Sequence, residues 1–358
     1  MTEETRAALD AKLGELHQRL MVAVEQLVTG EDWKRALQFA ARFRARSFRN
    51  ALLILAQHEA AFQAGRVPRP VPSYVAGYKQ WLSLGRQVER GQAGYMIFAP
   101  LTGRFASSTP QDLDSWRRLG KFEKPRPGEV ARSRMVGAKT AYVWDVSLTR
   151  GDPIPERPAV PPLAGVAPSG LWDGLAALTE AEGFAVQRVP DAAAIGGADG
   201  RTHYEARTVS VREDLSAAEQ AVTLAHELAH VRLHGANTRD ATDHRGIREV
   251  EAESVAMMVA AAHDMQATRP SALYVAEWAN SVEDKRPEEV VQETGERVRR
   301  AVASILDALP TVQVGTGDPP GLVRDAPAPS EAPTYQASVA GVEPRSASTS
   351  VAGAEHRL

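Results

Sequence analysis

The chain contains no cysteine, which excludes a disulfide framework, a thiolate metal site and a cysteine nucleophile. It also lacks any run of about 18 consecutive apolar residues, the length that crosses a bilayer as a helix. The N-terminal residues do not show a basic segment followed by an apolar one, which is the pattern of a secretory signal. From these absences we expect a cytoplasmic protein with no membrane partner.

The formal net charge of −3 conceals a strong asymmetry along the chain. Residues 1–150 hold 24 Lys and Arg against 14 Asp and Glu, whereas the remainder holds 18 against 31. A basic half is typical of a domain that binds a polyanion, because each phosphate neutralised by Lys or Arg releases counterions. The alternative is an ordinary solvated basic surface, or one that meets an acidic protein.

The most informative stretch is the H-E-x-x-H motif of His226, Glu227 and His230. On a helix, two histidines four residues apart lie on one face, so both imidazoles can bind one metal ion. Glu227 is turned by about 100° from His226, which suits a general base better than a ligand. Ser216 and Glu219 form a capping-box pattern, so we expect the helix to begin there.

A third ligand is expected from a second helix that follows the motif. Glu249, Ala252, Glu253 and Ala256 share one helical face, and the small alanines would let this helix approach the first. Glu249 can then complete a zinc site, and Glu253 can hold a ligand histidine through its second ring nitrogen. Glu251 points elsewhere. The alternative is a pair of surface helices whose charged side chains are merely solvated.

His226 to His230, together with Glu249 to Glu253, resemble the zinc metallopeptidase domain of the ImmA/IrrE type. The resemblance implies a small sheet packed on the helix that carries the histidines, with one zinc ion per chain. Residues 208–212 would supply one strand of that sheet.

The basic half contains two segments with candidate nucleic-acid contacts. Residues 4–28 and 32–48 have helical apolar spacing, and in the second helix arginines alternate with phenylalanines that either stack on bases or belong to the core. Residues 78–100 predict a helix, a turn and an apolar strand, and a polar, basic insertion follows at 103–139. The candidate contacts are Arg42, Arg44, Arg46, Arg49, Asn50, Lys79, Trp81, Arg86 and Arg90.

Three segments of this half are similar to the N-terminal domain of ArdC-type antirestriction proteins. They are residues 47–54, residues 78–100, and residues 143–149, which read Val-Trp-Asp-Val-Ser-Leu-Thr. The resemblance implies single-stranded DNA as a partner of this domain.

These observations predict an α+β protein with two domains. Residues 1–150 would form the DNA-binding domain, and the proline-rich residues 151–165 an extended linker. Residues 166–310 would form the metallopeptidase domain, and residues 311–358, rich in Pro, Gly, Ser, Ala and Thr, a disordered tail. Within the second domain we expect helices at 171–182, 271–279 and 287–309 and a strand at 184–189.

The predicted chemistry is the hydrolysis of a peptide bond. Zinc would lower the pKa of its bound water toward about 7, Glu227 would take the proton, and the hydroxide would attack the carbonyl. His203, Tyr204, His234 and His244 are candidates for stabilising the oxyanion. The protein substrate cannot be read from the sequence. Two alternatives remain open. One is a DNA-binding antirestriction protein whose zinc is mainly structural. The other is a transcription or stress regulator, either one whose basic half binds a protein or a protease that cleaves a repressor or stress-response partner.

Overall fold

The computed structural model describes residues 3–27, 29–154, 166–235, 245–265, 278–280, 282 and 285–322. Contacts divide the chain into two compact units. The first holds the described parts of residues 1–102 and 135–324, and the structure describes residues 103–134 of the second. No helix in the described part of the chain has the length and apolar character needed to span a membrane.

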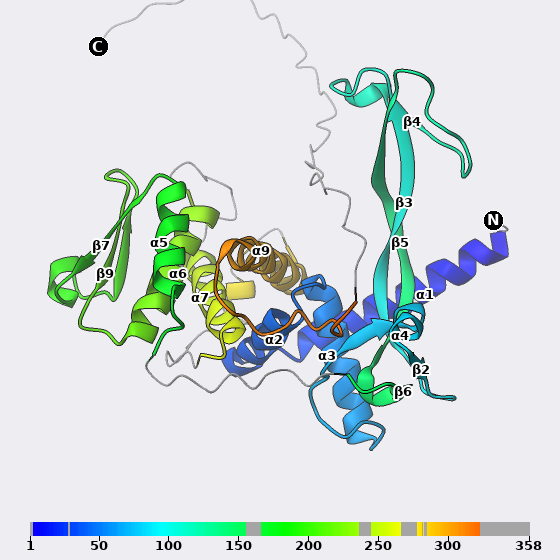
Figure 1. Ribbon diagram of the computed structural model, residues 1–358, viewed down its shortest axis with the longest axis horizontal. Coiled ribbons are helices and arrows are strands. Elements are labelled where there is room, and N and C mark those ends of the chain that lie inside the picture. Colours follow the sequence, from blue (N-terminus) through cyan, green and yellow to red (C-terminus); the bar gives the residue numbers. More distant parts are fainter. Residues whose placement is uncertain are drawn as a thin grey trace, which may run out of the picture. The chain divides into compact units, whose positions relative to one another are not determined.

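Three helices open the first unit (Figure 1), where the apolar spacing predicts two, because the chain turns between the second and third: α1 (Glu3–Glu25), α2 (Gly30–Arg42) and α3 (Phe48–Gln63). Thr29 and Asp32 form a reciprocal capping box at the start of α2, and the Ser47 side chain accepts from Asn50 N at the start of α3. These caps satisfy backbone donors that have no partner inside the helix.

The next elements form antiparallel sheets. In chain order they are β1 (Val75–Gly77), α4 (Tyr78–Ser83), β2 (Arg86–Val88), β3 (Tyr95–Ser107), η1 (Leu113–Ser115), β4 (Arg117–Arg118), β5 (Val130–Asp145), η2 (Val146–Leu148) and β6 (Thr149–Gly151). One sheet has the order β1-β5-β3-β4, with Val75 opposite Asp145, and a second pairs β2 with β6. The sequence predicts a polar insertion at 103–139, but the end of β3, β4 and much of β5 lie there, and β3 and β5 continue from the first unit into the second.

The later part of the first unit carries a small sheet beside helices (Figure 1). Its elements are α5 (Leu171–Ala181), β7 (Ala185–Val189), η3 (Ala192–Ile195), β8 (Gly200–His203), β9 (Thr208–Arg212), α6 (Ala217–Leu233), α7 (Arg245–Ala262) and α9 (Pro287–Ala308). The sheet order is β7-β9-β8, with β7 parallel and β8 antiparallel to β9. The expected strands at 184–189 and 208–212 and the expected helices at 171–182 and 287–309 are therefore confirmed. Most of the expected helix at 271–279 lies outside the described residues.

One hydrophobic core joins α1–α3 to α7 and α9. Trp33 of α2 donates from its indole nitrogen to the Ser254 hydroxyl of α7, at 2.9 Å. Its ring packs edge-on against Phe48 and Trp278. The N-terminal helices thus support the helix that carries Glu249.

The structure corrects the expected start of the disordered tail at residue 311. Val314 N donates to Ala262 O at 2.7 Å, and Val75 N donates to Gly317 O at 3.0 Å. Gly317 has a positive φ of 84° and lies directly against the Phe43 ring, where a β-carbon would clash. The composition of residues 311–322 predicts disorder because it contains few apolar side chains. The packing instead depends on backbone hydrogen bonds and on one glycine, which composition does not reveal. Residues 323–358 lie outside the described part of the chain.

Candidate metal centre

The helix α6 places both histidines of the motif on one face. Ser216 and Glu219 form the predicted capping box, with Ser216 N donating to Glu219 Oε2 at 3.0 Å. Leu224 and Leu228 are fully buried and fix the rotation of the helix against its neighbours. The histidines are consequently held toward α7 by the packing of the opposite side of α6.

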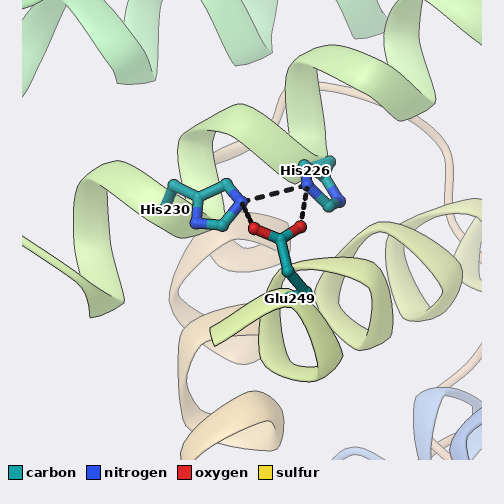
Figure 2. A group of neighbouring side chains, drawn as sticks. All are labelled: His226, His230 and Glu249. Atoms are coloured by element: carbon teal, nitrogen blue, oxygen red, sulfur yellow. Dashed lines mark hydrogen bonds and ion pairs between the residues drawn. The ribbon is translucent and has the colours of Figure 1, made fainter. Parts of the chain in front are cut away.

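Figure 2 shows His226 and His230 on α6 facing Glu249 on α7. The two Nε2 atoms are 3.0 Å apart. Glu249 Oε2 lies 3.6 Å from His226 Nε2, and Glu249 Oε1 lies 3.7 Å from His230 Nε2. Within the described residues, one ligand atom from each side chain falls within 4.8 Å of the others, a spacing that one metal ion can bridge.

The electrostatics of this cluster also fit a cation. Burial alone would lower the pKa of His226, but the nearby carboxylates of Glu249, Glu253 and Glu227 outweigh it and raise that pKa to about 9. Hydrogen bonds to His226 and His230 lower the pKa of Glu249. Two unprotonated Nε2 atoms at 3.0 Å would repel through their lone pairs, so a proton or a metal ion must lie between them. The donor set of two imidazoles and one carboxylate is one that divalent zinc accepts.

A chain of buried side chains supports His230 from behind. His230 Nδ1 lies 3.0 Å from His234 Nδ1, and His234 Nε2 lies 2.9 Å from Glu251 Oε2. The other oxygen of Glu251 accepts from Arg297 Nε on α9. With neutral His234 donating from Nε2 to the carboxylate, its Nδ1 accepts, so His230 Nδ1 must be the donor. This order leaves the lone pair of His230 Nε2 facing the candidate metal position.

His226 has a looser support on its second nitrogen. Glu253 Oε2 lies 3.5 Å from His226 Nδ1, which is a charge contact and too long for a good hydrogen bond. The sequence anticipates Glu253 in this place but does not reveal the roles of His234 and Glu251. The recurrence of histidine at 226, 230 and 234, one helical turn apart, is the signal that could have found His234.

Glu227 is only 6% exposed and lies between α6 and the edge strand β8. The Thr202 hydroxyl donates to Glu227 Oε2 at 2.6 Å. A β-carbon on Gly200 would lie 2.8 Å from Glu227 Oε1, so the glycine lets the strand approach the carboxylate closely. Thr202 and Gly200 therefore fix the position of the candidate base, and the sequence does not predict either role.

The four oxyanion candidates have different surroundings. The Tyr204 hydroxyl donates to the backbone oxygen of His230 at 3.0 Å, and burial raises the pKa of Tyr204 to about 12. His203 is exposed and its Nδ1 accepts from Ala206 N. His234 is bonded to His230 and Glu251, as described above, and His244 lies outside the described residues. Both ring nitrogens of His234 are engaged, which leaves no donor free for an oxyanion.

The structure separates the candidate nucleic-acid contacts into two groups. Asn50 is buried and bonds the backbone of Phe98 in both directions, and Trp81 is buried and donates to Trp144 O. These two side chains make contacts inside the protein. Three of the candidate arginines are likewise part-buried or bonded internally: Arg44, Arg46 and Arg86. The exposed candidates are Arg42, Arg49, Lys79 and Arg90. Among these, Arg42 lies 3.4 Å from Asp264, and Arg49 lies over the Phe98 ring.

Two families match successive parts of the chain. Residues 14–144 match the N-terminal domain of anti-restriction factor ArdC, and residues 180–283 match the IrrE N-terminal-like domain. The second match contains His226, His230 and Glu249. No curated protein matches the chain.

Two crystal structures of the antirestriction ArdC protein from plasmid R388 are similar to this chain. The metal-free structure is 18% identical with a TM-score of 0.46, and the similarity covers 74% of this chain and 84% of that one. The Mn(II)-bound structure is 19% identical with a TM-score of 0.42, and the similarity covers 74% and 88%.

Proposed function

We propose a function for this chain from its place among the ArdC-type antirestriction proteins, the family to which its two domains together assign it. In this proposal the chain protects DNA, binds single-stranded DNA through residues 1–150, and hydrolyses a peptide bond of a protein substrate at one zinc site. His226, His230 and Glu249 are the proposed ligands and Glu227 the proposed base.

The single observation that carries the hydrolytic part is the convergence of three ligand atoms within 4.8 Å beside a buried glutamate. A bound zinc ion would supply a Lewis acid that polarises the carbonyl and makes water more acidic. The side chain of Glu249 is 54% exposed, so the cluster is open to solvent on one side. Catalytic zinc sites need such an open side, whereas structural sites are closed by protein ligands.

The roles of the surrounding residues follow from their contacts. Thr202 donates to Glu227 Oε2 and leaves Oε1 to accept the proton of the attacking water. The hydrogen-bonded chain behind His230 keeps that ring turned toward the metal position. Among the strands in the described residues, β8 next to Glu227 pairs on one side only, so its other side could pair with an extended peptide.

A mainly structural metal is the second candidate, because the ligands join two helices. His226 and His230 belong to α6 and Glu249 to α7, so an ion there would tie these helices together. This role needs the ligands but not Glu227. The substitution Glu227→Gln therefore separates the two candidates.

The experiment measures zinc content and peptide hydrolysis in the full chain. We expect about one zinc per chain in the unaltered protein, loss of zinc in His226→Ala/His230→Ala, and retention in the control His203→Ala, which alters an exposed histidine of β8. Glu227→Gln should keep zinc and folding while hydrolysis is lost. Undiminished hydrolysis in Glu227→Gln would remove the base role, and a protein that never binds zinc would remove the site.

A further inference from the structure

The second compact unit, residues 103–134, is a strongly basic arm. It holds eight Lys and Arg against four Asp and Glu, so it supplies +4 of the +10 balance of residues 1–150. It consists of the end of β3, η1, β4 and the beginning of β5. Most of its side chains are exposed, including those on β5 from Val130 to Ser133. An arm whose side chains are mostly exposed buries little apolar area of its own, which is a reason to look for a partner that covers it.

The arm is ordered by its acidic residues. Arg117 pairs with Glu123 and with Glu129, the latter at 2.8 Å. The same carboxylates accept from the backbone, Glu123 from Gly120 N at 2.9 Å and Glu129 from Arg126 N at 2.7 Å. Two of the four acidic side chains thus hold the loop in place. They are used for folding, so they do not neutralise the exposed basic residues around them.

The remaining basic residues form an exposed cluster. Arg118, Lys121 and Lys124 are exposed, and no carboxylate of the described residues lies within ion-pair distance of them. Two further arginines lie over an aromatic ring: Arg134 is 4.5 Å and Arg132 is 5.2 Å from the centre of the Trp116 ring. The charges of Arg118, Lys121 and Lys124 are therefore available for an external anion.

An aromatic ring lies within that exposed cluster. Phe122 is 86% exposed, and Lys121 Nζ lies 5.2 Å from the centre of its ring. Lys124 follows Phe122 by two residues, so the aromatic residue stands between two lysines in the sequence. Exposed rings beside cations are the elements with which proteins bind single strands, since bases stack on the ring while phosphates meet the charges.

We propose that residues 103–134 form the surface that binds single-stranded nucleic acid, with Phe122 stacking on a base and Arg118, Lys121 and Lys124 contacting phosphates. The inference rests on the proposed DNA partner. It assigns the binding surface to residues other than the candidate contacts that the sequence singles out. A duplex offers the phosphates but hides the base faces, so the exposed ring favours a single strand. An acidic protein would use the charges and would not need the ring.

The test uses the full chain, a single-stranded oligonucleotide of mixed sequence and its duplex, at two salt concentrations. The arm variant Lys121→Ala/Lys124→Ala is compared with Lys79→Ala/Arg90→Ala, which removes the same number of charges from exposed positions outside the arm. We expect the arm variant to lose more affinity and to lower the log-log salt slope by about 1.4, or about 0.7 for each phosphate contact. Phe122→Ala should weaken single-strand binding about fivefold or more and change duplex binding less.

The outcomes separate this inference from the proposed function. A full chain that binds no single strand at low salt removes the DNA partner itself. Normal binding by the arm variant, with loss in Lys79→Ala/Arg90→Ala, overturns the arm while the DNA partner stands. Equal effects of Phe122→Ala on single and double strands, or none on either, overturn the stacking role. All five side chains are exposed, so circular dichroism and thermal melting should be unchanged in each variant.

Discussion

At the scale of single residues, the arrangement behind His230 makes the candidate metal site sensitive to His234, a side chain that is not itself a proposed ligand. Arg297 donates to Glu251, Glu251 accepts from His234, and His234 fixes the proton of His230 on Nδ1. When a side chain without ring nitrogens replaces His234, nothing holds the proton on His230 Nδ1. The proton can then move to Nε2, where it occupies the lone pair that would bind the metal. The effect should therefore appear in metal binding before it appears in folding.

We expect His234→Phe to weaken zinc binding roughly 10- to 100-fold, the usual effect of removing a group that orients a metal ligand. Competition with a chelator measures the affinity, and nitrogen chemical shifts of the metal-free protein report the tautomer of His230. The control His203→Phe alters an exposed histidine with no contact to His230. Unchanged affinity together with an unchanged tautomer would show that His234 does not position the ligand.

A second prediction at this scale concerns His58, which is buried on α3. Its Nδ1 is 2.8 Å from the Tyr95 hydroxyl and its Nε2 is 2.9 Å from Arg69 O. Since a carbonyl only accepts, Nε2 carries the proton and Nδ1 accepts from the tyrosine. Burial lowers the pKa of His58 below its ordinary value of 6.5, against the raising effects of the Arg69 carbonyl and Asp145.

The sign follows from the lowered pKa. The unfolded chain binds a proton at His58 near pH 6.5 while the folded chain resists it, so stability falls as pH drops through 6.5 toward the folded pKa. We expect urea midpoints to decrease from pH 7 to 5, and to decrease less in His58→Gln. The buried His263, whose pKa is also lowered by burial, stays in both proteins. Equal pH slopes in the two proteins would contradict the prediction.

At the scale of elements, α9 meets α3 at a glycine. A β-carbon on Gly295 would lie 2.3 Å from the Phe48 ring, which is fully buried. Gly295→Ala should therefore destabilise the protein by roughly 1–3 kcal/mol, because a packed core must shift to accept the methyl group. Gly14→Ala is the matched control on α1, where nothing lies within 4 Å, and helix propensity alone should raise stability by about 0.5–1 kcal/mol. Chemical unfolding of both variants checks the opposite signs.

The elements differ in how well the sequence predicts them. The helices α6 and α9 and the strands β7 and β9 are predictable because apolar spacing and a capping box mark them locally. The long pairing of β3 with β5 is not, since β5 is almost fully exposed from Val130 to Lys139 and shows no alternation of buried and exposed residues there. The ligand face of Glu249 could be read from helical spacing. Glu251 could not, because its contact with His234 depends on how α6 packs on α7.

At the scale of the whole molecule, most of the predicted linker at 151–165 lies outside the described residues, so the contacts on either side of it show which parts fold together. The helices α1–α3 belong to the same compact unit as the candidate metal centre. A hydrogen bond such as Trp33 to Ser254 joins residues 221 positions apart, and no local pattern announces it. Sequence composition therefore indicates which parts are basic or proline-rich, while tertiary packing decides which parts fold together.

The same unit is completed by residues 311–322, which leads to a prediction for chains of different length. A chain ending at residue 322 keeps the bonds from Val314 N to Ala262 O and from Val75 N to Gly317 O, and it keeps Asp318 at 3.5 Å from Arg46. A chain ending at residue 310 loses all three contacts and uncovers Phe43. Each backbone bond contributes about 1 kcal/mol, and Arg46 would lose its contact with Asp318 while keeping its hydrogen bond to the carbonyl of Val75.

We therefore expect the chain ending at 310 to be less stable than the chain ending at 322 by roughly 2–4 kcal/mol, measured by urea unfolding. The substitution Gly317→Ala in the longer chain probes the same segment without shortening it, since its φ of 84° and its contact with Phe43 both oppose a β-carbon. Gly317→Ala should cause part of the same loss of stability. If both changes left the unfolding midpoint unaltered, residues 311–322 would not contribute to the core, and the tail would begin where the composition alone suggests.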